Sequence, residues 1–344
     1  MPASSAPNAA TYRTMTTRRE FTYRYIYAAP RCDKPFLLFL HGFPSTSFDW
    51  RYQVTYFSAR GYGLIVPDML GYAGTDKPED PKHYTAMSLA RDMIDLVDGA
   101  KAKHVIAIGH DWGAATISRL ALLHTDRFIG FAWLAVGLTK PDPTFEYYAF
   151  CAQLKRLTGS EVFGYWQTMD REATPDLYKE KVDALLTLLY PSDPSLWKTA
   201  LCPFGGLDAY LAVGKVQPLP KWLSNEDYEH MKRMLLDGGF RAPTNYYRVM
   251  VRHLEYEQTL TVDVKNKKID KLIFYGGALQ DYVCLAQPAK MSLVGLSDDY
   301  TTHEFDTSHW LQIEKPDEFN TVLEKWITLV IEVSKVRSNV YLLA

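Results

Sequence analysis

Asp111 lies at the centre of a stretch whose residue types and spacing are typical of a nucleophile. The apolar run 105–108 stops at Gly109, and Gly113 opens an alanine-rich helical pattern. Glycines two residues before and two after the central position permit a turn so tight that the central side chain stands above the sheet. A carboxylate that attacks tetrahedral carbon leaves an ester, which water can cleave, whereas a serine would leave an inert ether. The stretch therefore predicts a covalent carboxylate nucleophile, with an ordinary turn and a surface aspartate as the alternative.

Three further polar groups follow runs that are typical of strands. They are the His-Gly-Phe-Pro turn at 41–44, Asp281 and His309. Aspartate, second acid and histidine then occur in the chain order of a hydrolase triad on a doubly wound sheet. Taken alone, Asp281 could equally be an ordinary loop residue and His309 an ordinary core or surface residue. The prediction of a triad therefore rests on their combination with Asp111. His41 and His110 are expected to support the neighbouring turns rather than to react.

The apolar patterns predict a mostly parallel sheet covered by helices on both faces. Two alternating stretches at the start predict a hairpin, and most later strands are separated by helical patterns. This arrangement implies right-handed crossovers and a ligand site at the carboxyl ends of the strands. The predicted strands are 12–17, 20–27, 36–40, 63–67, 105–108, 131–136, 271–276 and 300–305, and the helices between and after them are 47–60, 85–98, the segment after Gly113 and 318–336.

A helical insertion interrupts this alternation. Its sequence shows helical periodicity and loops rich in proline and glycine, with no run typical of a buried strand. We therefore expect a core formed by residues 1–139 and 258–344, with an inserted helical domain formed by residues 140–257. The helices expected within the insertion are 145–157, 175–189, 207–213, 225–236 and 245–254.

Composition and charge limit the classes of partner. The 344 residues are 47% hydrophobic and 23% charged, with a formal net charge of −2, which gives no electrostatic reason to expect nucleic acid or an anionic membrane. No apolar run reaches the roughly 18 residues that span a bilayer. The four cysteines lack the spacing of a zinc site or a disulfide framework. We expect a cytoplasmic protein, with a peroxisomal location left open, that is a monomer or a homodimer.

Together these motifs resemble the α/β-hydrolase superfamily over nearly the whole chain, and within it the soluble epoxide hydrolases. The residues that carry the resemblance are the 41–44 turn, Gly-His-Asp-Trp-Gly at 109–113, Asn-Tyr-Tyr-Arg at 245–248, Asp281 and Ser-His-Trp at 308–310. The resemblance implies an α/β-hydrolase fold with a mostly parallel eight-stranded sheet and helices on both faces. It also implies that the insertion is a helical cap domain.

In that family two cap tyrosines hold the epoxide oxygen. The resemblance assigns this role to Tyr247 through its Asn-x-Tyr-Arg context. It assigns the other role to Tyr165, in Phe-Gly-Tyr, in preference to Tyr147, Tyr148 and Tyr190. A phenol suits the task because it is acidic enough to donate a strong hydrogen bond to a leaving oxygen, yet stays protonated at neutral pH.

The resemblance implies roles for the other site residues as well. It makes Asp111 the nucleophile, His309 the general base for the water that cleaves the ester, and Asp281 the residue that orients the histidine. It places the oxyanion hole at the backbone N–H groups of Phe43 and Trp112. The side chains expected to bind substrate are those of Phe43, Trp112, Phe163, Trp166, Tyr246 and Trp310. The implied reactants are a small-molecule epoxide and water, without a metal or an organic cofactor.

Two alternatives come from different functional classes. A haloalkane dehalogenase shares the nucleophile and Trp112, but it often has an asparagine donor in the third position of the turn, where this chain has Phe43. A ligand-binding protein on the hydrolase shell has no need for acid–base groups gathered in one cleft. We therefore predict the hydrolysis of apolar epoxides to vicinal diols.

Overall fold

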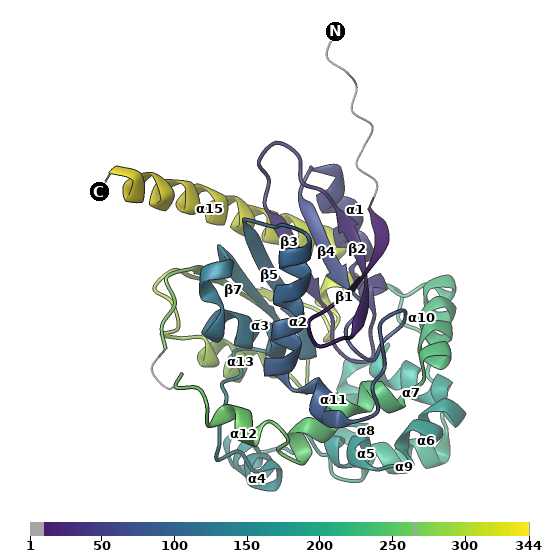
Figure 1. Ribbon diagram of the computed structural model, residues 1–344. Coiled ribbons are helices and arrows are strands. Elements are labelled where there is room, and N and C mark those ends of the chain that lie inside the picture. Colours follow the sequence, from purple (N-terminus) through teal and green to yellow (C-terminus); the bar gives the residue numbers. More distant parts are fainter. Residues whose placement is uncertain (1–9, 265–266, 344) are drawn as a thin grey trace.

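An eight-stranded sheet forms the centre of the molecule in this computed structural model, which describes residues 10–264 and 267–343, the side chains of 338–343 excepted (Figure 1). The strand order is β1-β2-β4-β3-β5-β6-β7-β8, and the pairs β1–β2 and β2–β4 are antiparallel. All other pairs are parallel, which confirms the predicted sheet. The strands are β1 (Thr11–Thr16), β2 (Thr22–Ala28), β3 (Phe36–Leu40), β4 (Gly63–Pro67), β5 (Val105–His110), β6 (Gly130–Leu134), β7 (Leu272–Ala278) and β8 (Tyr300–Phe305).

Helices cover both faces of this sheet, so its central strands are continuous apolar runs. All five residues of β3 are buried. Helices α2 (Ala86–Gly99) and α3 (Trp112–Leu123) pack together on one face, and α1 (Arg51–Ala59) and α15 (Pro316–Leu343) pack together on the other (Figure 1). The shorter elements of the core are α13 (Ala286–Ser292), α14 (Leu311–Glu314) and the 3-10 turns η1 (Ser47–Trp50), η2 (Pro81–Tyr84) and η3 (Thr125–Arg127).

Between β6 and β7 the described residues form helices and loops only. These helices gather at one end of the sheet, where Figure 1 shows them in teal and green. They are α4 (Tyr147–Thr158), α5 (Trp166–Asp170), α6 (Thr174–Glu180), α7 (Val182–Leu189), α8 (Trp197–Ala200), α9 (Gly206–Val213), α10 (Asn225–Gly238), α11 (Arg241–Val251) and α12 (Tyr256–Thr259), with the 3-10 turn η4 (Pro194–Leu196).

The single helix expected at 175–189 is wrong, because the structure has two helices there. Lys181 has φ −107° and ψ 29°, so α6 ends before it and α7 begins after it. Helix α6 buries only Thr174 and Tyr178, whereas α7 is buried along nearly its whole length. No glycine or proline marks the break, so the periodicity runs through it. Helices α5, α8 and α12 were also missed, because four or five residues are too few for a periodic pattern.

Helix α15 is the longest helix of the described residues and extends from the body of the molecule (Figure 1). Among the described residues no helix combines the length and apolar character that a membrane crossing requires.

Candidate active site

Asp111 occupies the sharp turn between β5 and α3. Its backbone angles, φ 54° and ψ −123°, lie outside the helical and extended regions, as expected for a residue thrust above a sheet. A Cβ at Gly113 would overlap the carbonyl of Leu40 in β3, and a Cβ at Gly42 would overlap Oδ1 of Asp111. The two glycines therefore allow the turn and the 41–44 loop to approach the carboxylate closely.

Backbone N–H groups face the carboxylate of Asp111. The N–H of Phe43 donates to Oδ1 at 2.8 Å, and the N–H of Trp112 also favours the ionised form. Burial raises the pKa of Asp111, while His309 and these two N–H groups oppose the shift. The same donors could receive charge that develops on this oxygen when the carboxyl group is attacked.

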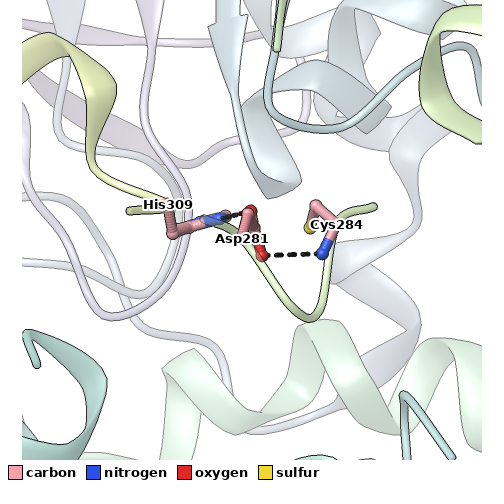
Figure 2. Close-up of side chains that lie close together, drawn as sticks. All are labelled: Asp281, Cys284 and His309. Carbon is pink, nitrogen blue, oxygen red and sulfur yellow. Dashed lines mark hydrogen bonds and ion pairs between the residues drawn. The ribbon is translucent and has the colours of Figure 1, made fainter. Parts of the chain in front are cut away.

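Asp281 and His309 form an acid–base pair (Figure 2), and His309 lies beside Asp111. The Nδ1 of His309 lies 2.6 Å from Oδ2 of Asp281, and its Nε2 lies 3.7 Å from Oδ2 of Asp111. Oδ1 of Asp281 accepts the N–H groups of Val283 and Cys284 at 2.9 and 2.8 Å. These bonds hold Asp281 as an acceptor, so Nδ1 of His309 carries the hydrogen and Nε2 is left to take a proton.

The pKa of His309 is raised above its usual value. Burial disfavours the charged imidazole, but the charge and hydrogen bond of Asp281, together with the charge of Asp111, outweigh that penalty. The imidazolium that forms when His309 accepts a proton is therefore stabilised by its two carboxylate neighbours.

Cys284 lies next to this pair, and donor atoms of Asp281, Cys284 and His309 all lie within 4.8 Å of one another (Figure 2). Such a set could in principle hold a soft divalent metal. However, burial and then the charge of Asp281 raise the pKa of the Cys284 thiol well above its usual value, which disfavours the thiolate that a metal would need. Both carboxylate oxygens of Asp281 also have hydrogen-bond donors, so the set fits a triad better than a metal site.

His41 and His110 support the turns around the nucleophile. Nε2 of His41 accepts the N–H of Met69 at 2.9 Å, so its Nδ1 donates to the carbonyl of Gly42 at 2.9 Å. Burial lowers the pKa of His41 to about 4, which keeps this ring neutral. His110 donates from Nε2 to the carbonyl of His309 at 2.9 Å, and burial lowers its pKa as well. Both rings are thus committed to backbone contacts.

Two phenols from the insertion lie above Asp111. Tyr165 precedes α5 and Tyr247 lies within α11, and their ring centroids are 5.8 Å apart. Burial raises the pKa of each hydroxyl well above 10, and the charge of Asp111 raises it further. The ring of Tyr247 stands edge-on to those of Phe43 and Trp112, at 5.3 and 5.1 Å. Both phenols are therefore held in the protonated form near Asp111.

The three other tyrosines considered for this role lie elsewhere. The hydroxyl of Tyr147 donates to the carbonyl of Phe163 at 2.8 Å, and Tyr148 is 53% exposed. The hydroxyl of Tyr190 donates to the carbonyl of Pro44 at 2.7 Å. This geometry supports the choice of Tyr165.

The side chains expected to bind substrate fall into two groups. The rings of Trp112 and Phe163 pack against Trp166, at 5.5 and 4.7 Å, and Phe43 packs against Tyr247. The other two use their polar groups within the protein: Tyr246 donates to the carbonyl of Leu70 at 2.9 Å, and Trp310 donates to that of Leu189 at 2.7 Å. The first group forms an aromatic wall beside the phenols, and the second braces the surrounding backbone.

Sequence reasoning missed Trp197 and Cys284. The ring of Trp197 lies 5.7 Å from that of His309, and the thiol of Cys284 lies beside Asp281. Trp197 belongs to a four-residue helix with no motif around it, so no signal pointed to it. Cys284 follows Asp281 by three residues, and that proximity was the available signal.

Comparison with known proteins agrees with this geometry. Residues 35–200 match the family model of the alpha/beta hydrolase fold. Epoxide hydrolase 2 of Siraitia grosvenorii is 30% identical over 229 residues, which are 65% of this chain and 68% of that protein. The chain belongs to the epoxide hydrolase family of this fold.

Other epoxide hydrolases are similar over more of the chain. Epoxide hydrolase A of Mycobacterium tuberculosis is 28% identical over 302 residues, which are 86% of this chain and 90% of that protein. The crystal structure of epoxide hydrolase A from Mycobacterium thermoresistibile has a TM-score of 0.75 and 26% identity to this chain, and covers 92% of this chain and 97% of the other. The predicted α/β-hydrolase fold and the predicted family are both confirmed.

Proposed function

We propose that this protein hydrolyses apolar epoxides to vicinal diols through a covalent ester on Asp111. The observation that carries the proposal is a buried carboxylate beneath two protonated phenols, with His309 Nε2 at 3.7 Å. The names of the related proteins support the same reaction. Within the family we assign the protein to the soluble class, acting in the cytoplasm, with residues 140–257 as its cap domain.

The first step opens the epoxide ring. Asp111 attacks the less hindered ring carbon, a carbon–oxygen bond of the carboxylate forms, and the bond from that carbon to the ring oxygen breaks. The leaving alkoxide is strongly basic, so it needs a proton donor at neutral pH. Tyr165 and Tyr247 supply hydrogen bonds and the proton, and their raised pKa values keep that proton in place until the oxygen becomes basic.

The second step cleaves the ester. His309 takes a proton from water at Nε2, and the resulting hydroxide attacks the carbonyl carbon of Asp111. The N–H groups of Phe43 and Trp112 stabilise the oxyanion, and loss of one such donor costs about 3 kcal/mol in a comparable hydrolase. Asp281 stabilises the imidazolium meanwhile. On collapse of the intermediate, the bond from the carbonyl carbon to the alkyl oxygen breaks and that oxygen takes the proton from His309. The new carboxylic acid of Asp111 returns a proton to the tyrosinate, so the diol leaves and the carboxylate is regenerated with an oxygen from water.

Phe43 favours this reaction over removal of a halide. A leaving halide needs N–H donors rather than a proton, and the third position of the 41–44 turn carries a phenyl ring that cannot donate. That ring instead packs edge-on to Tyr247, at 5.3 Å. The aromatic wall of Phe43, Trp112, Phe163 and Trp166 suits an apolar substrate.

Two measurements test the proposal. The protein is incubated with styrene oxide and, separately, with a bromoalkane, and diol and bromide are quantified. We expect diol from the first and no bromide from the second, and an Asp111→Asn variant should give neither. In a single turnover in ¹⁸O water, the label should enter the carboxyl group of Asp111 rather than the diol. Diol that carries solvent oxygen directly would overturn the covalent mechanism.

A further inference from the structure

The carboxyl end of α7 is bound to the core by buried side-chain hydrogen bonds. The indole N–H of Trp310 donates to the carbonyl of Leu189, the last residue of α7, at 2.7 Å. The hydroxyl of the next residue, Tyr190, donates to the carbonyl of Pro44 at 2.7 Å. Tyr190 and Trp310 are both fully enclosed. The last carbonyls of a helix have no hydrogen-bond donor within the helix, and here the core residue Trp310 supplies a donor to one of them.

The bond to Pro44 fixes the loop that carries the oxyanion donor. Pro44 directly follows Phe43, whose N–H donates to Oδ1 of Asp111 at 2.8 Å. Oδ2 of Asp49 accepts the Ser45 hydroxyl at 2.6 Å and lies 3.4 Å from the hydroxyl of Tyr190. The Tyr190 hydroxyl therefore contacts this loop one peptide from the donor.

The ring of Tyr190 contacts the residue next to the general base. It stacks on Trp310, with centroids 4.2 Å apart and planes at 19°. The ring of Trp310 stands perpendicular to that of His309, at 5.0 Å. Trp197 packs on His309 as well, and its indole N–H donates to the carbonyl of Leu188 at 2.7 Å. Two indoles that flank the imidazole are thus anchored to the last turn of α7.

We propose that Tyr190 is a positioning residue for cleavage of the ester. Its hydroxyl holds the loop of the Phe43 donor, and its ring holds Trp310 and through it His309. The inference rests on the proposed function, because it assigns Tyr190 to the second of the two steps. The oxyanion donor and the general base both serve that step, and a small displacement of either slows it sharply. Tyr165 and Tyr247 serve ring opening, so different residues of the insertion contribute to the two steps.

The test is a Tyr190→Phe variant, which removes the hydroxyl and keeps the stacked ring. Ester formation and ester decay are measured separately, by rapid quenching with styrene oxide and mass spectrometry of the intact protein. We expect ester decay to slow about tenfold, since one positioning hydrogen bond is worth about that factor. Ester formation should change less than about twofold, so kcat falls while kcat/KM, which is set by binding and ring opening, stays close to its original value.

Tyr228→Phe is the matched control. Tyr228 of α10 donates to Asp183, near the start of α7, at 2.6 Å. This variant therefore removes a hydroxyl that contacts the other end of α7. It should leave both rates unchanged. Tyr190→Leu also removes the stacked ring, and its ester should decay more slowly than that of Tyr190→Phe. The thermal midpoint of each variant reports whether the fold is retained.

The outcomes separate the two proposals. A wild-type protein that forms no ester with styrene oxide refutes the covalent function itself. An ester that forms normally but decays at the wild-type rate in Tyr190→Phe refutes the role of Tyr190 and leaves the function intact. Equal slowing of formation and decay would show that Tyr190 only supports the structure of the site, which also refutes the proposal.

Discussion

The two sides of the reacting centre are held by different kinds of contact. On the sheet side, His309 and Asp281 lie 2.6 Å apart, and the N–H of Phe43 lies 2.8 Å from Asp111. On the cap side, Tyr165 and Tyr247 are placed by ring packing, with centroids 5.8 Å apart. Charge-assisted hydrogen bonds fix both distance and direction, whereas ring packing tolerates small shifts. The positions of the sheet-side groups are therefore fixed by hydrogen bonds within the site, whereas the positions of the two phenols depend on how the insertion is attached to the core.

Among the contacts that join the insertion to the core, two ion pairs differ in burial. Arg119 and Glu255 lie 2.7 Å apart with side chains only 5% and 8% exposed, and Arg119 also donates to the carbonyl of Thr139. Because Thr139 and Glu255 stand near the start and the end of the insertion, one guanidinium binds both connections. Arg51 and Asp227 form the second pair at 2.8 Å, with 16% and 22% exposure. The ion pair at the two connections of the insertion is thus buried, and the ion pair between Arg51 and Asp227 is more exposed to solvent.

The largest effect that separates the two sides is expected from His309→Gln. This variant keeps the nucleophile and both phenols but removes the general base, so ester cleavage should slow about 10³-fold. Protein heavier by one substrate molecule should then accumulate, as read from the intact mass. Unchanged turnover in this variant would break the comparison, because the sheet side would not control the second step.

Glu255→Gln tests how the cap is attached. The change leaves the Arg119 guanidinium buried without its charged partner, so we expect a loss of about 3 kcal/mol in the free energy of unfolding. Denaturant titration measures that loss. Asp227→Asn is the matched change at the more exposed pair, and it should cost less than about 1 kcal/mol. Equal costs would remove the distinction between the two attachments.

Tyr247→Phe tests the cap side itself. The variant keeps the ring packing and removes one donor to the leaving oxygen, so ring opening should slow about 10²-fold. The decay of an ester that has already formed should stay within about twofold of the wild-type rate. Single-turnover quenching distinguishes the two steps. A variant that slowed decay instead would place Tyr247 with the sheet-side groups.

The smallest effect concerns pH. His309 must be neutral to take a proton, so ester cleavage should fall as pH drops through its pKa, which the carboxylates of Asp281 and Asp111 raise against the effect of burial. Formation of the ester removes the charge of Asp111, so the pKa of His309 should be lower in the ester than in the free enzyme. The acidic limb of ester decay should therefore lie below the histidine titration of the free protein, measured by NMR. Coincident curves would contradict this coupling.

Much of the sheet side could be predicted from the sequence. Each of its predictions rests on a short stretch of sequence: the glycines around Asp111, and the apolar runs that end before Asp281 and before His309. The order of the three residues along the chain then indicated a triad. The break at Lys181 could not be predicted, because no helix-breaking residue marks it. Nor could the choice among the tyrosines of the insertion be made from residue type alone, since the hydroxyl of Tyr190, for example, donates to Pro44, 146 positions away.

The sequence by itself predicted a mostly parallel sheet, the tight turn at Asp111 and a helical insertion, because each leaves a pattern in residues close together in the chain, whereas the strand order came from the structure. Only the tertiary structure decided which cap groups meet the core. Tyr190 reaches Pro44 across 146 positions and Arg119 reaches Glu255 across 136. Such contacts leave no periodic signal, because packing brings the residues together only after both elements have formed.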